Sequence, residues 1–143
     1  MNGPNRRLTG IPAVTLLFIL STASVCAEPS LSCTYQLLAS SYEYLAACGV
    51  DIDAKRYETY KRLRTALRDF INLNGPSGKA PIDSAYDESL RERTRLTART
   101  EQCQGQTRQF ADSFFEALTT EEFAMSLSDR LSSPHDPYEG DCL

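Results

Sequence analysis

The sequence predicts an all-α fold: a small, disulfide-stapled helical bundle of three to four helices that follows a cleaved signal peptide. Two observations favour helices: apolar residues recur at helical spacing, and no segment alternates apolar and polar residues over the length of a strand. A different observation predicts the disulfides: four cysteines remain after the predicted cleavage, an even number typical of small exported domains. The 143 residues are enough for one domain.

Residues 1–27 have the three parts of a secretory signal peptide. Arg6 and Arg7 supply a positive start, residues 13–20 form an apolar run, and small or polar residues follow up to Ala27. The apolar run is shorter than the ~20 residues that span a bilayer. We therefore expect cleavage after Ala27 and no transmembrane anchor on the mature chain.

Lipidation of Cys26 is the alternative fate of this segment. It is disfavoured because the branched Val25 stands where a small residue is wanted. With cleavage after Ala27, Cys26 leaves with the signal peptide and the mature chain keeps 13 basic and 19 acidic residues. We expect a periplasmic or secreted protein.

The helical domain is expected over residues 28–133. Its first helix, 32–48, carries apolar residues on one face, has Ser32 as a candidate N-cap and ends before Gly49. The second helix, 52–73, is expected to begin at an aspartate and to stop at a loop rich in glycine and proline.

Three further helical segments complete the domain. The first, 84–103, has Ser84 as its candidate N-cap, and Gly105 separates it from 106–118. A last helix is expected to open with Thr119, and an extended C-terminal tail covers 134–143. The first of these segments is unusually polar, and a thin seam at seven-residue intervals is expected along it and into the next; the seam consists of Ser89, Leu96, Cys103 and Phe110.

The helix directions predict how the cysteines pair. Cys33 and Cys48 lie on one helix about 22 Å apart along its axis, whereas a disulfide needs Cα atoms within ~7 Å. The third helix is expected to run in the same direction as the first, so that Cys103 at its end lies beside Cys48. This arrangement predicts the disulfide Cys48–Cys103. The remaining pair, Cys33–Cys142, would attach the C-terminal tail to the bundle. No two cysteines have the close spacing of a zinc site, so we expect no metal ligands.

Catalysis and cofactors are not predicted. His135 is the single histidine, so a serine or cysteine nucleophile has one candidate base, and this base lies in an irregular tail. The acidic residues around it match no calcium-loop spacing. The sequence therefore predicts a protein that is not an enzyme and carries no cofactor, metal or catalytic residue.

Charge is segregated along the chain. Residues 51–109 carry net +3 and residues 110–143 carry net −7. Two helical ridges hold the basic side chains; they consist of Arg91, Arg95 and Arg99 on one helix and Lys61, Arg64 and Arg68 on the other. Each ridge is open to three interpretations: a solvated helix face, internal pairing with the acidic C-terminal segment, or a surface for an anion or a partner.

The leading functional hypothesis is an exported, non-enzymatic protein-interaction or envelope-accessory module. Its partner would be an acidic protein or an anionic component of the cell envelope. The alternative is a small-ligand or anion-binding periplasmic protein. Nucleic-acid binding is disfavoured because the mature chain is acidic and has no stacking aromatic residues among its arginines.

Overall fold

The computed structural model describes residues 28–142 and is all-helical over that range. The predicted signal peptide and residue 143 lie outside the described residues. Five helices exceed the three to four expected, because each of the five helical segments that the sequence delimits forms a helix of its own. In chain order they are α1 (Leu31–Ala47), α2 (Ala54–Asn74), α3 (Ser84–Thr100), α4 (Gln106–Leu118) and α5 (Glu121–Arg130).

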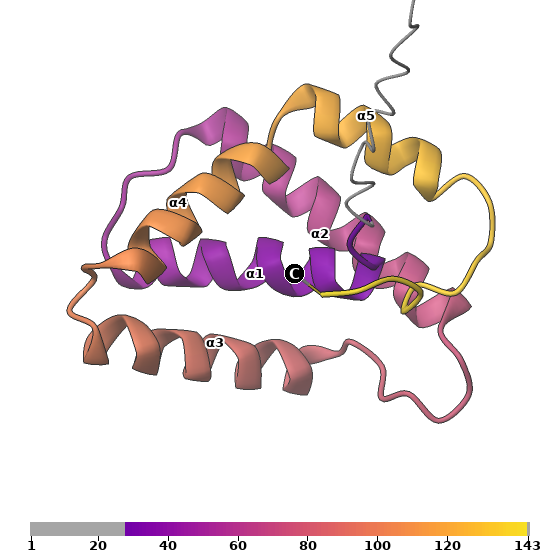
Figure 1. Cartoon of the computed structure of the whole chain (residues 1–143), viewed down its shortest axis with the longest axis horizontal. Coiled ribbons are helices and arrows are strands. Elements are labelled where there is room, and N and C mark those ends of the chain that lie inside the picture. The colour runs from indigo at the N-terminus through magenta and orange to yellow at the C-terminus, as the bar shows by residue number, and fades with distance from the viewer. Residues whose placement is uncertain (1–27, 143) are drawn as a thin grey trace, which may run out of the picture.

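Helix α1 is the centre of the bundle, and α2, α3 and α4 all pack against it, as Figure 1 shows. In that view α3 runs below α1, and α4 and α5 lie above it. Contact on several sides buries most of α1, including polar residues such as Thr34, Ser41 and Glu43. The core therefore forms around one helix, with Tyr35, Leu38 and other residues of α1 at its middle.

The helix starts differ from the expected caps by one or two residues. Ser30, not Ser32, caps α1 by accepting a hydrogen bond from the Cys33 amide at 3.2 Å. Asp83, not Ser84, caps α3, and Thr120, not Thr119, caps α5. Several neighbouring serine, threonine and aspartate side chains can satisfy the free amides of a first turn, so composition alone does not distinguish them.

A turn with left-handed backbone separates α3 from α4. Helix α3 stops at Thr100, three residues earlier than expected, because Gln102 and Cys103 have φ of 52° and 56° and Gly105 has φ of 83°. This turn brings Cys103 to Cys48 at the end of α1, with 5.6 Å between the Cα atoms. Since this disulfide joins their C-terminal ends and Tyr35 bonds to Asp87 near their N-terminal ends, α1 and α3 run parallel.

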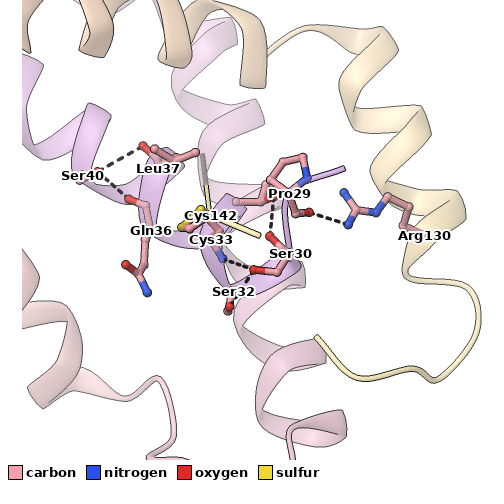
Figure 2. The surroundings of a disulfide bond; sticks show 10 residues. Pro29, Ser30, Ser32, Cys33, Gln36, Leu37, Ser40, Arg130 and Cys142 are labelled. Atoms are coloured by element: carbon pink, nitrogen blue, oxygen red, sulfur yellow. Dashed lines mark hydrogen bonds between the residues drawn. A yellow bond between two sulfur atoms is a disulfide. The ribbon is translucent and has the colours of Figure 1, made fainter. Parts of the chain in front are cut away.

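The tail is fastened to the start of α1. Cys33 and Cys142 form the second predicted disulfide, with a Cα–Cα distance of 5.4 Å. Figure 2 shows this disulfide together with the hydrogen bond that Arg130 of α5 donates to the Pro29 carbonyl, 2.9 Å long. The amide of Ser32 also bonds to the Pro137 carbonyl. Both ends of the described chain therefore meet at one end of the bundle.

Candidate partner-binding surface

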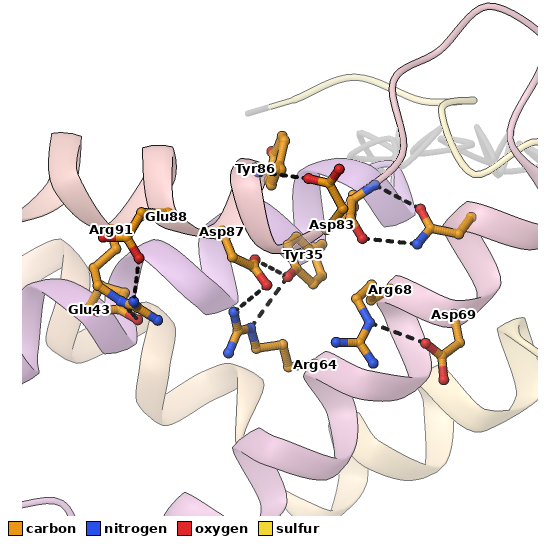
Figure 3. A network of polar contacts seen from close by, with 12 residues as sticks. Tyr35, Glu43, Arg64, Arg68, Asp69, Asp83, Tyr86, Asp87, Glu88 and Arg91 are labelled. Carbon is orange, nitrogen blue, oxygen red and sulfur yellow. Dashed lines mark hydrogen bonds and ion pairs between the residues drawn. The ribbon is translucent and has the colours of Figure 1, made fainter.

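The six basic residues of the two predicted ridges have three different environments. Two of them point into the bundle and join helices, two pair with acidic neighbours on their own helix, and two are exposed on α3. The inward pair is Arg64 and Arg91, so at these two positions the structure shows internal pairing and not a solvated helix face. Figure 3 shows the inward pair with its partners.

Arg64 of α2 joins three helices through one polar contact. Its Nη2 lies 2.7 Å from Oδ2 of Asp87 on α3, and its Nε donates to the Tyr35 hydroxyl of α1. That hydroxyl donates to the second oxygen of Asp87 at 2.5 Å. Burial and the bond to Asp87 raise the pKa of Tyr35 to about 12. Burial opposes the charge of Arg64, but its anionic and phenolic neighbours outweigh it and hold the arginine pKa above its ordinary value.

Arg91 of α3 pairs with a buried carboxylate of the central helix. Its Nε lies 3.3 Å from Oε1 of Glu43, and its Nη1 lies 2.7 Å from Oε2 of Glu88. The Glu43 side chain is only 9% exposed. The hydrogen bond to Glu43 raises the pKa of Arg91, so the guanidinium stays charged and compensates the buried carboxylate.

The acidic C-terminal segment does not cover the basic ridges in the described part of the chain. Its ion pairs with α2 involve Lys55 and Arg56 at the start of that helix, and these bind Glu121 and Glu116. Lys61 and Arg68 pair instead with Glu58 and Asp69 beside them on α2. Internal pairing of the ridges therefore comes from carboxylates of α1, α2 and α3, not from the C-terminal third of the chain.

The exposed part of α3 carries three arginines around an apolar side chain. Arg95 and Arg99 are exposed, and no ion pair involves either of them within residues 28–142. Leu96 between them is 65% exposed. These three residues line a shallow recess of about 500 Å³ with Arg93, Glu88 and Glu92. We call this surface the α3 arginine face.

A groove beside this face lies between α1, α3 and α4 and has a volume of about 660 Å³. Leu37 and Tyr44 of α1, Leu90 of α3, and Phe110 and Phe114 of α4 are among its lining residues. Phe110 is 58% exposed and its ring centroid is 6.3 Å from that of Phe114. Arg93 lines both the groove and the recess, so the two features adjoin at this side chain.

The expected seam of Ser89, Leu96, Cys103 and Phe110 is not a buried contact, since Leu96 and Phe110 are both largely exposed. Ser89 and Leu96 lie on the side of α3 opposite to its buried residues Leu90 and Ala98, and the turn after Thr100 ends the repeat. The groove was not among the features predicted from the sequence, although the Phe110 and Phe114 pair at spacing i, i+4 is a signal for an apolar helix face.

Among residues 28–142 no cluster of histidine, cysteine or acidic side chains could hold a metal ion. Within the same range, no helix has the length and apolar character needed to cross a membrane. Searches against protein-family models, curated proteins and solved structures find no match to the chain.

Proposed function

We propose that this chain is an exported, non-enzymatic protein-interaction module that binds an acidic protein partner through the α3 arginine face. The observation that carries the proposal is the pairing of exposed Arg95 and Arg99 with an exposed Leu96. Arginine can dock a carboxylate through two parallel hydrogen bonds, and interfaces are enriched in arginine beside apolar contacts. The two acidic residues of the recess limit its net charge, which favours a partner with a defined pattern of acidic groups over a uniformly charged polyanion.

Export is supported by the two disulfides and by the signal-peptide pattern of residues 1–27. We expect the protein purified from its host to begin at Glu28 and to have no free thiol. Intact-mass measurement with thiol alkylation tests both expectations. A mass that retains residues 1–27, a lipid on Cys26, or four alkylated cysteines would contradict export as proposed.

Photo-crosslinking in the native host tests the binding face. A photoreactive amino acid replaces Leu96, or, as the matched control, Met125 on α5, which is 64% exposed. We expect a protein adduct from position 96 that is absent from position 125, since only the first lies on the α3 arginine face.

The charge dependence of that adduct separates specific docking from simple exposure. In the background Arg95→Glu/Arg99→Glu, the adduct at position 96 should fall at least several-fold, because like charges repel an acidic partner. The control Arg62→Glu/Lys79→Glu makes the same change in net charge elsewhere and should leave the adduct unchanged. Equal adducts at positions 96 and 125, or an adduct that survives the α3 reversal, would refute the proposal.

A further inference from the structure

The groove between α1, α3 and α4 has the dimensions of a short helix-binding site. Its α1 residues run from Gln36 to Tyr44, which corresponds to ~12 Å along the helix axis. An amphipathic helix with apolar residues at i, i+3, i+4 and i+7 presents its anchors over ~10 Å. The groove therefore matches about two turns of a partner helix.

Three of the hydroxyl groups that line the groove are already bonded within their own helices. Ser40, Thr94 and Thr97 each donate a hydrogen bond back to a carbonyl of their own helix, at 2.6, 2.8 and 3.1 Å. With its proton committed, each hydroxyl offers an incoming group at most an acceptor, and each threonine also offers a methyl group. The two phenylalanines supply the larger apolar contact, and such a surface fits aliphatic side chains better than a small polar ligand.

The positive charge of Arg93 favours an acidic residue on the edge of the partner helix. Arg93 stands between the groove and the α3 arginine face, and its Nε donates to the Ser89 carbonyl at 3.3 Å. This bond holds the stem of the side chain against α3 and leaves its two terminal nitrogens to meet a carboxylate. Arg95 and Arg99 extend the positive charge away from the groove.

We infer that the groove binds an amphipathic helix of a partner protein, with apolar residues against Phe110 and Phe114 and an acidic residue against Arg93. The inference rests on the proposed interaction function and adds the chemistry of the bound segment. The exposed phenylalanine and the adjacent arginines make one continuous docking surface.

Peptide binding tests the inference directly. The probe is a synthetic amphipathic helix with leucines at i, i+3, i+4 and i+7 and glutamates beside them, and its counterpart has lysines in place of the glutamates. Fluorescence anisotropy at low salt should show that the purified mature protein binds the glutamate peptide and binds the lysine peptide at least several-fold more weakly.

Two variants locate the binding. Phe110→Ala should weaken binding about tenfold or more, as expected for an aromatic anchor, whereas Leu73→Ala, at an 83% exposed position on α2, should leave it unchanged. Arg93→Glu should reverse the preference, so that the lysine peptide binds more tightly than the glutamate peptide. Circular dichroism of each variant checks that the helices remain.

Four results would overturn the inference. They are unchanged binding by Phe110→Ala, a peptide preference that ignores Arg93, a dimer of the wild type that Phe110→Ala dissociates, and fatty-acid binding in place of peptide binding. The third would assign the groove to a second copy, and the fourth to a lipid.

The photo-crosslinking experiment keeps this inference separate from the proposed function. If the adduct at position 96 depends on Arg95 and Arg99 but is unaffected by Phe110→Ala, the interaction function stands and the groove is not part of it. If the adduct is indifferent to both sets of changes, the proposed function fails as well.

Discussion

Glu43 of α1 and Arg91 of α3 form a charged contact of 3.3 Å beneath the surface of the bundle. The glutamate is on the helix that three others cover, and the arginine reaches it from the outside. A buried carboxylate without a compensating donor is strongly destabilising. This contact therefore fixes the position of α3 against the central helix. Arg91 is engaged in stabilising the fold and is not free to bind a partner.

Truncating Arg91 should destabilise the protein, whereas truncating Arg95 one turn later should not. Arg91→Ala leaves the Glu43 carboxylate buried without its donor and should lower the free energy of unfolding by about 2 kcal/mol. Arg95→Ala removes an exposed side chain and should change it by no more than about 0.5 kcal/mol. Urea denaturation measures both, and equal effects would mean that the Glu43 contact does not hold α3.

Removing each of two buried tyrosine hydroxyls should change the free energy of unfolding differently. The Tyr35 hydroxyl bonds to Asp87 and Arg64, so Tyr35→Phe should lower the free energy of unfolding by about 1 kcal/mol. The Tyr60 hydroxyl is buried with no hydrogen-bond partner among the described residues, so Tyr60→Phe should be neutral or stabilising. Thermal or urea unfolding checks both, and a clear loss of stability in Tyr60→Phe would reveal a partner for that hydroxyl.

Alkaline pH should weaken the fold through Tyr35. Its pKa is raised from the ordinary value of 10.0 to about 12, chiefly by burial, so the unfolded chain releases this proton at a lower pH than the folded chain. The stabilising effect is complete below pH 10 and is lost as pH rises through 12. The free energy of unfolding should thus fall between these values, and Tyr35→Phe should show a smaller fall. Denaturation at a series of pH values, followed with tyrosinate absorbance, tests the difference.

A methyl group at Gly140 should loosen the tail. The backbone there has φ of +110°, and a Cβ would lie 2.9 Å from the Glu28 carbonyl oxygen and 3.1 Å from the Ser30 amide nitrogen. Gly78 has φ of +93° but no atom within 4 Å of the added carbon. Gly78→Ala should therefore cost about 1 kcal/mol from backbone strain alone, and Gly140→Ala should cost more. Limited proteolysis should cut the tail faster only in Gly140→Ala, and equal cleavage of the two variants would contradict close packing of the tail.

Much of the fold could be predicted from the sequence, because the strongest signals are local. Apolar spacing and the loop of residues 74–82 bound α1, α2 and α3 closely, and both disulfides are confirmed as paired. The pairing was predictable because a continuous helix keeps Cys33 and Cys48 apart. The expected count of three to four helices was too low, although the sequence placed the break between α4 and α5 correctly to within one residue of the cap at Thr120.

The candidate site was less predictable, because burial depends on partners distant in the chain. Arg91, Arg95 and Arg99 have the same spacing and chemistry, yet only Arg91 faces a carboxylate, 48 residues earlier in the chain. The groove arises where three helices meet, so no single segment contains it. The spacing of apolar residues predicts the apolar face of a single helix. It does not predict which apolar residues of α4 are left exposed once the other helices have packed.

The long separation between Cys33 and Cys142 has a consequence for how the chain matures. During synthesis at about 5–20 residues per second, Cys33 emerges some 5–20 s before the partner that lies 109 residues later. Cys48 and Cys103 both emerge in that interval, so two incorrect partners precede the correct one. Helix α1 excludes one of them by its length, and because it also holds Cys48 at the end where Cys103 arrives, it removes the second from competition. In the completed bundle, the central helix thus keeps apart two cysteines that emerge long before their correct partners.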